Sequence, residues 1–250
     1  MLKKENKKHL EEVEMEFIKV KTYEELSRKA AQIILDQLKK KPDSVLGLAT
    51  GSTPIGTYDE LIKAYNDGNA DFSKVRSVNL DEYCGLPETN DQSYRYFMNE
   101  HLFDKVNIDK SKTNVPGGVT DDPDAECKRY DNVVKELGGI DLQILGIGVN
   151  GHIGFNEPSD EFSEGTHVVT LDERTRNSNA RFFEKMSDVP TKAITMGIGT
   201  IMSAKKILLL ANGDAKKEII EKAVYGEITP NVPASILQKH DDLTVIFSEN

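Results

Sequence analysis

Three side chains that could take part in proton transfer lie within one short glycine-rich stretch, Gly146–Pro158 (GIGVNGHIGFNEP). Asn150, His152 and Glu157 bring a carboxamide, an imidazole and a carboxylate close together in the sequence. The imidazole is the natural proton carrier of the group near neutral pH. A glycine-rich turn with a hydrogen-bonded histidine is the simpler alternative. The four glycines of the stretch and Glu157 favour a site of acid-base chemistry.

A second stretch that could bind a ligand follows the apolar run Val45–Ala49 and consists of Thr50, Gly51, Ser52, Thr53 and Pro54. Ser52 or Thr53 could cap a helix whose first position is Pro54. Free backbone N–H groups and hydroxyls would then point at whatever lies above the strand, which suits a phosphate. The turn lacks the lysine and the spacing of a Walker loop, so a simple helix cap is the alternative.

Charged residues also follow two other apolar runs. Asp81 and Glu82 come directly after the run Val75–Leu80, where a carboxylate could act as a general base, although paired acids there also suit a solvated turn. Lys216 lies in the first turn of a helix expected after Ile207–Ala211, where a positive charge opposes the helix dipole. A bound anion at that helix end would explain the lysine. An ordinary surface lysine is the alternative.

The elements that must position these residues alternate along the chain. Apolar runs predict strands at Val45–Ala49, Val75–Leu80, Leu142–Gly146, His167–Leu171, Ala193–Met196, Ile207–Ala211 and Leu243–Phe247. Helical patterns lie at Thr22 to about Lys41, Ser93–Phe103, Asp122 to Gly138, Thr175–Phe183, Lys216 to about Tyr225 and Pro233–Lys239. This alternation predicts an α/β fold with a mostly parallel sheet covered by helices on both faces. The candidate residues should then converge at the carboxyl ends of the strands.

Composition restricts the class of protein. The chain has 250 residues and a net charge of −10, with 38% hydrophobic and 30% charged residues, as in soluble globular proteins. The charge argues against a general nucleic-acid surface, and no apolar run approaches the roughly 20 residues of a membrane helix. We expect a cytoplasmic protein without a secretion signal, with residues 1–14 as a charged extension and residues 15–250 as one catalytic domain. Cys84 and Cys127 suggest free thiols and no metal site.

Five ordered stretches, LGLATGSTPIGTY, VNLDEYCGL, LGIGVNGHIGFNEP, SNARFF and ANGDAKK, together resemble the glucosamine-6-phosphate deaminase family. The similarity extends from about Met15 to the C-terminus. The resemblance implies a Rossmann-like fold and the conversion of glucosamine 6-phosphate and water into fructose 6-phosphate and ammonia. It also implies a small sugar phosphate as the partner and no metal or organic cofactor. A homo-oligomer is a further expectation.

Site roles carry over from the family by motif position. Asp81 resembles the general base that moves a proton between C2 and C1 of the open-chain sugar. His152 resembles the histidine that assists ring opening, and Glu157 resembles the carboxylate that orients it. The phosphate-binding set implied by the resemblance consists of Thr50, Gly51, Ser52, Thr53, Arg181 and Lys216.

The chain departs from the family pattern at two places. Asn150 stands where several members have Asp, so Glu157 is left as the carboxylate flanking His152. Residues 159–169 are acidic, whereas allosterically activated members carry a basic cluster there, so we expect no activation by an acetylated sugar phosphate. A 6-phosphogluconolactonase is the nearest enzyme alternative, and a sugar-phosphate sensor is the alternative from another class. A sensor should bring a DNA-binding helix pair, for which the first 20 residues are too short.

Overall fold

Seven parallel strands form the main sheet of the structure, a computed structural model that describes residues 15–171, 173, 176, 183 and 185–249. The strand order is β1-β10-β9-β6-β2-β3-β5. In that order the strands are Glu16–Val20, Leu243–Ser248, Ile207–Asn212, Leu142–Gly146, Val45–Leu48, Arg76–Asn79 and Thr113–Asn114. Because both faces of such a sheet are covered, the inner strands are mostly buried, and β9 and β10 are almost completely so.

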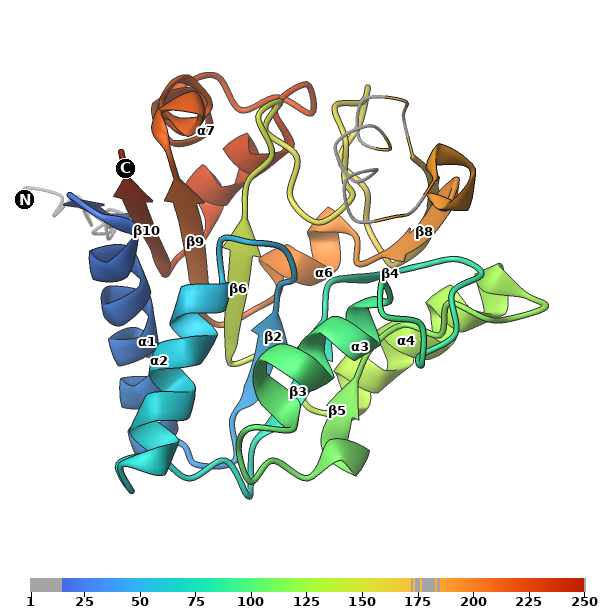
Figure 1. Ribbon diagram of the computed structural model, residues 1–250. Coiled ribbons are helices and arrows are strands. Elements are labelled where there is room, and N and C mark those ends of the chain that lie inside the picture. Colours follow the sequence, from blue (N-terminus) through green and yellow to red (C-terminus); the bar gives the residue numbers. More distant parts are fainter. Residues whose placement is uncertain (1–14, 172, 174–175, 177–182, 184, 250) are drawn as a thin grey trace, which may run out of the picture.

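Helices lie on both faces of this sheet, as the sequence predicts (Figure 1). The chain crosses the sheet in one direction from β1 to β5 and in the other from β5 to β10, and right-handed crossovers therefore place the two sets of helices on opposite faces. The first set is α1 (Tyr23–Lys40), α2 (Ile55–Asn66), α3 (Tyr94–Met98) and the π-helix η1 (Asn99–Phe103). The second set is α4 (Pro123–Glu136), α6 (Ile198–Met202), α7 (Lys217–Tyr225) and the 3-10 helix η6 (Pro233–Lys239). Further 3-10 turns are η2 (Lys110–Lys112), η4 (Met186–Asp188) and η5 (Asp214–Lys216).

Local sequence signals explain where the helices begin and end. The side chain of Thr22 accepts a hydrogen bond from the backbone N–H of Glu25 and so caps α1. The side chain of Asp122 likewise caps α4. Gly138 and Gly139, which follow α4, both have positive φ angles and end it as predicted.

A second, antiparallel sheet of three strands lies beside the end of β3. Its order is β4-β8-β7, with bounds Asp81–Tyr83, Lys192–Thr195 and His167–Thr170. Leu80 joins the two sheets, because its N–H donates to Leu48 of β2 and its carbonyl accepts from Met196, directly after β8. The strand β4 was not predicted. The solvated turn considered for Asp81 and Glu82 is wrong, since their side chains are 6% and 2% exposed within this strand.

Some predictions fall on residues that the structure does not describe. The charged extension 1–14 lies outside the described residues, and so does most of the helix predicted at Thr175–Phe183, including Arg181. Within the described part of the chain, no helix is long and apolar enough to cross a membrane.

Candidate active site

The strands β2 and β6 are neighbours from which the chain leaves toward opposite faces of the sheet. In open α/β sheets, ligands bind at such a switch point, beyond the carboxyl ends of the strands. The turn Thr50–Pro54 follows β2, and the stretch Gly146–Pro158 begins at the end of β6. The topology therefore places the two predicted motifs at this switch point, one at the carboxyl end of each strand.

The turn after β2 leaves its hydroxyls available. Gly51 has a φ of 94°, and the helix α2 starts after Pro54 without a side-chain cap. The predicted cap by Ser52 or Thr53 is therefore wrong. A tyrosine of α1 supplies the cap instead, since the backbone N–H of Gly56 donates to the hydroxyl of Tyr23 at 2.8 Å.

The stretch after β6 contains a connected group of polar side chains. Nδ2 of Asn150 donates to Oε2 of Glu157 at 2.6 Å, and Oδ1 of Asn150 accepts from the backbone N–H of His152 at 3.2 Å. Nδ1 of His152 lies 3.4 Å from the same Oε2 of Glu157. Asn150 therefore holds the carboxylate and the histidine backbone, and the carboxylate lies against the imidazole. All three side chains that were predicted from this motif come together.

Two glycines in the same stretch are required by the site itself. A Cβ at Gly148 would lie 2.2 to 2.4 Å from ring atoms of His152. Gly154 has a φ of 57°, and a Cβ there would lie 3.5 Å from Oδ2 of Asp81. The imidazole thus occupies the space that a side chain at position 148 would take, whereas position 154 favours glycine because of its positive φ and the hydroxyl of Thr195, 3.0 Å from such a Cβ. Gly154 also shows that Asp81 of β4 lies next to the stretch after β6.

Thr195 ties these two parts of the site together, although no sequence signal singled it out. In the small sheet Thr195 is the cross-strand partner of Asp81, so their side chains share a face. Its Oγ1 accepts a hydrogen bond of 3.0 Å from the backbone N–H of Phe155. This buried hydroxyl therefore fixes the loop beside Asp81.

The carboxyl group of Asp81 is buried in a way that makes it a strong base. Burial and then the charge of the neighbouring Glu82 raise the pKa of Asp81 to about 8. When the pKa of a base lies near the working pH, a sizeable fraction of the base is ionised and its basicity is still high enough to remove a proton. The small exposed fraction of Asp81 still allows contact with a bound ligand.

Glu82 has a different task from its neighbour. Its carboxylate accepts backbone N–H groups of Tyr83, Tyr94 and Arg95 at 2.8 to 3.0 Å and so anchors the start of α3. Burial raises the pKa of Glu82 to about 6, and these hydrogen bonds oppose the rise. The acid pair therefore divides into one carboxyl without such contacts and one carboxylate that is fixed by the backbone.

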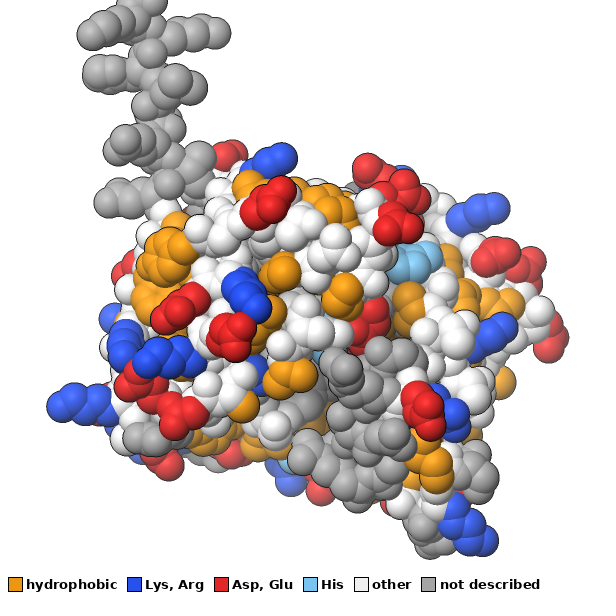
Figure 2. Space-filling model, turned by 90° about the horizontal axis from the view of Figure 1, so that it is seen from above, with side chains coloured by type: hydrophobic (Ala, Val, Ile, Leu, Met, Phe, Trp, Pro, Cys, Tyr) orange, Lys and Arg blue, Asp and Glu red, His pale blue; other side chains and the backbone are white. Residues whose placement is uncertain are grey.

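Lys216 supplies a half-buried positive charge at the same edge. Its Nζ donates to the carbonyl of Ile147, directly after β6, at 2.6 Å. Burial lowers the pKa of this amine. Lys216 follows β9, which pairs with β6, so it approaches the end of β6 from the side opposite the turn after β2. Lys and Arg side chains elsewhere on this edge are scattered among acidic ones (Figure 2).

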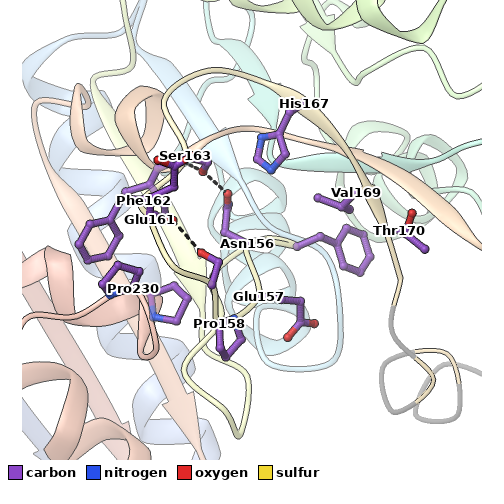
Figure 3. A pocket seen from close by; sticks show the side chains of 14 residues that line it. Asn156, Glu157, Pro158, Glu161, Phe162, Ser163, His167, Val169, Thr170 and Pro230 are labelled. Atoms are coloured by element: carbon purple, nitrogen blue, oxygen red, sulfur yellow. Dashed lines mark hydrogen bonds between the residues drawn. The ribbon is translucent and has the colours of Figure 1, made fainter.

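A cavity of about 250 Å³ lies beside Glu157 (Figure 3). Phe155, Phe162 and Pro230 contribute apolar walls, and His167 lies at its rim. Among the predicted site residues that the structure describes, Glu157 alone lines it. Asp81 and the group formed by Asn150 and His152 lie outside it, near the carboxyl ends of β3 and β6.

The wall of this cavity includes Asn156, a second residue that positions the loop. Its Nδ2 donates to the carbonyls of Ile153 and Met196 at 2.9 Å, and its Oδ1 accepts from Ser163 at 2.6 Å. The sequence motif contained Asn156 but gave no sign of this role. Within the described residues, no three His, Cys, Asp or Glu side chains are grouped as a metal site would require.

Comparison with known proteins assigns the family. Residues 19–246 match the model of the family described as glucosamine-6-phosphate isomerases/6-phosphogluconolactonase. The chain belongs to this family. The matched region spans all the predicted site residues, which lie between Thr50 and Lys216.

Relatives within the family are close in sequence and length. A protein of Lachnoclostridium phytofermentans named glucosamine-6-phosphate deaminase is 64% identical over 93% of this chain and 98% of its own length. A protein of Clostridium novyi with the same name is 57% identical over 94% of this chain and 98% of its own length. A solved structure described as a monomeric glucosamine-6-phosphate deaminase has a TM-score of 0.91 at 50% identity, covering 94% of this chain and 97% of its own. A solved structure of a 6-phosphogluconolactonase of Thermotoga maritima shares the fold, with a TM-score of 0.74 at 18% identity. The match covers 95% of this chain and 100% of the other.

Proposed function

We propose that this protein converts glucosamine 6-phosphate and water into fructose 6-phosphate and ammonia. The observation that carries the proposal is the 64% identity, over nearly the whole chain, to a protein named for this activity. The lactonase alternative has weaker support, because the lactonase structure shares only the fold at 18% identity. The sensor alternative has no relative among the proteins described above.

Ring opening is the step that we assign to His152. Opening the pyranose requires a proton to leave the O1 hydroxyl and a proton to reach O5, which suits one imidazole that accepts and then donates. Glu157 lies 3.4 Å from Nδ1 and can stabilise the positive charge that the ring carries between the two transfers. Asn150 holds Glu157 for this task through the 2.6 Å hydrogen bond.

Isomerisation is the step that we assign to Asp81. Once the sugar is open, the C1 aldehyde acidifies the C–H bond at C2. The ionised carboxylate of Asp81 removes that proton, and the electron pair forms a C1–C2 double bond with negative charge on O1. O1 then takes a proton from the C2 amine, and the protonated Asp81 returns its proton to C1, which leaves a C1 hydroxyl and a C2 imine. Water adds to C2, and ammonia leaves as the C2 ketone forms.

Phosphate binding is assigned to the turn Thr50–Thr53 and Lys216. The phosphate takes no part in the bond changes, so its contacts serve to hold C1 and C2 within reach of Asp81. The hydroxyls of Thr50, Ser52 and Thr53 make no hydrogen bond within the described part of the chain, which leaves them available. Arg181 is a further phosphate ligand in this proposal.

The activity is tested by measuring ammonia and fructose 6-phosphate released from glucosamine 6-phosphate by the purified protein. We expect equal amounts of both products, and the same rate in excess chelator. Hydrolysis of 6-phosphogluconolactone without ammonia release would support the lactonase instead. Binding of the sugar phosphate without turnover would support the sensor. A rate lost in chelator and restored by a divalent ion would overturn the metal-free mechanism.

Three further points belong to the same proposal. The protein works in the cytoplasm, and residues 15–250 act as one catalytic domain. The solved relative at 50% identity is described as monomeric, which favours a monomer over the homo-oligomer expected from the sequence. Sedimentation of the purified protein distinguishes a mass near 27.9 kDa from a multiple of it.

A further inference from the structure

The hydroxyl of Tyr23, the first residue of α1, reaches the turn that follows β2. It donates to the backbone carbonyls of Ser52 and Thr53, both at 3.0 Å. The same hydroxyl accepts the backbone N–H of Gly56 at 2.8 Å. A tyrosine hydroxyl has one hydrogen to donate, so the two carbonyls share it. One side chain outside the motif therefore makes three contacts with the turn.

Because of these contacts, the hydroxyls of Ser52 and Thr53 are not needed to cap α2. The first N–H groups of a helix need acceptors, which a Ser or Thr side chain usually provides. Here α2 has no side-chain cap of its own, and Tyr23 accepts from Gly56 instead. Ser52 and Thr53 consequently keep their hydroxyls for a ligand.

The contacts also set the direction in which the backbone groups point. A trans peptide is planar, so the N–H of Thr53 points away from the carbonyl of Ser52 in the same peptide. Because Tyr23 holds that carbonyl on the α1 side, the N–H of Thr53 faces the other way. The carbonyls of Ser52 and Thr53, whose partial negative charge would repel an anion, are both held on the α1 side.

Close packing of two helices brings Tyr23 within reach. A Cβ at Gly56 would lie 2.4 Å from Oγ of Ser27 and 3.0 Å from Cε1 of Tyr23. The start of α2 can therefore approach α1 this closely only with glycine at position 56. This close approach brings the hydroxyl of Tyr23 within hydrogen-bonding distance of the turn.

We propose that Tyr23 is a positioning residue for the phosphate of the substrate, acting through the turn Thr50–Thr53 without touching the ligand. The inference rests on the proposed function, since it assigns the phosphate to this turn. It adds a residue outside every motif that the family resemblance rests on.

The test is the Tyr23→Phe variant, which removes the hydroxyl and keeps the ring. We expect KM for glucosamine 6-phosphate to rise about 3- to 10-fold, as for the loss of one hydrogen-bonding group, with kcat within about twofold. Competitive inhibition by inorganic phosphate should weaken by a similar factor. Asn107→Ala serves as the control, because it removes side-chain hydrogen bonds to Asp71 and Phe72 beyond the other end of α2.

The possible outcomes separate this inference from the proposed function. If the wild type releases ammonia but Tyr23→Phe leaves both KM and phosphate inhibition unchanged, the inference is wrong and the function stands. If the control raises KM as much as Tyr23→Phe does, the effect is general destabilisation and the inference is also wrong. If the wild type releases no ammonia, the function fails, and direct calorimetric titration of both proteins with inorganic phosphate still decides the role of Tyr23. Equal affinities, or no binding to the wild type, would then overturn it.

Discussion

Nδ2 of Asn150 lies 2.6 Å from Oε2 of Glu157, the carboxylate oxygen that faces Nδ1 of His152. Among the described residues, no hydrogen bond joins the amide to the imidazole itself. The amide acts on the ring through Glu157 and on the backbone of His152 through Oδ1. Replacement of an aspartate by asparagine at this position exchanges a second negative charge for a hydrogen-bond donor that the remaining carboxylate can use.

Asn150→Ala should therefore lower kcat by roughly tenfold or more, with KM within a few-fold, because Glu157 loses the donor that holds it against His152. The double variant with Glu157→Gln should be little worse than Glu157→Gln alone, since both changes act on one contact. Asn90→Ala is the matched control, because Asn90 accepts a similar backbone hydrogen bond from Gln92 in a loop of another part of the chain. Additive losses in the double variant would show that Asn150 acts independently of Glu157.

Gly148→Ala should reduce kcat by about 100-fold, because the added methyl group would occupy the space of the His152 ring and displace it. Gly146→Ala is the control in the same stretch, since a Cβ there meets no atom within 4 Å. Ammonia release by the two variants, with thermal unfolding to confirm that both are folded, makes the comparison. Equal activities of the two variants would mean that the ring is not held where the structure places it.

The strands and most helices could be predicted because their signals are local. Apolar runs mark β2, β6, β9 and β10, and the caps at Thr22 and Asp122 start α1 and α4. The short strand β4 was missed because its acids suggest a turn, and only its pairing with β8 makes it a strand. Local sequence cannot show a pairing between residues more than 100 positions apart.

The geometry of the candidate site could also be predicted only in part. Asn150, His152 and Glu157 were expected to lie together because they belong to one motif, and the structure brings them together. The contacts of Tyr23 and Thr195 could not be predicted, since each joins two segments that are distant in sequence. The cap expected from Ser52 or Thr53 was wrong for the same reason, because Tyr23 of another helix takes that place.

Lys216→Ala should raise KM for glucosamine 6-phosphate about tenfold or more, as expected for the loss of one charge-assisted contact to a phosphate. Inhibition by inorganic phosphate should weaken in parallel. Lys217→Ala is a close control, because the neighbouring Lys217 is exposed and lies 3.8 Å from Glu249. Since burial lowers the pKa of Lys216, phosphate affinity should also begin to fall at a lower pH than for an exposed lysine. An unchanged KM in Lys216→Ala would show that the phosphate binds elsewhere.

Asp81→Asn should abolish turnover and make the protein more stable. A general base contributes about 100- to 10,000-fold to the rate, so kcat should fall at least that far while KM stays within a few-fold. The stability gain follows from the pKa of about 8 in the folded protein, against the ordinary value of 3.8. Between these two values the unfolded chain has an ionised carboxylate and the folded protein a protonated one. The folded state then binds more protons, and the contribution of Asp81 to stability falls as the pH rises through this window.

The asparagine side chain of the variant cannot ionise, so its stability should not fall in this way as the pH rises. We expect the free energy of unfolding of Asp81→Asn to exceed that of the wild type by about 1 to 2 kcal/mol at pH 8. Near pH 4 the two free energies should be nearly equal. Urea unfolding of both proteins at several pH values measures the difference. Asp43→Asn is the control, because it makes the same substitution at an exposed carboxylate. A wild type as stable as Asp81→Asn at pH 8 would mean that the carboxyl of Asp81 ionises without the cost that its burial implies.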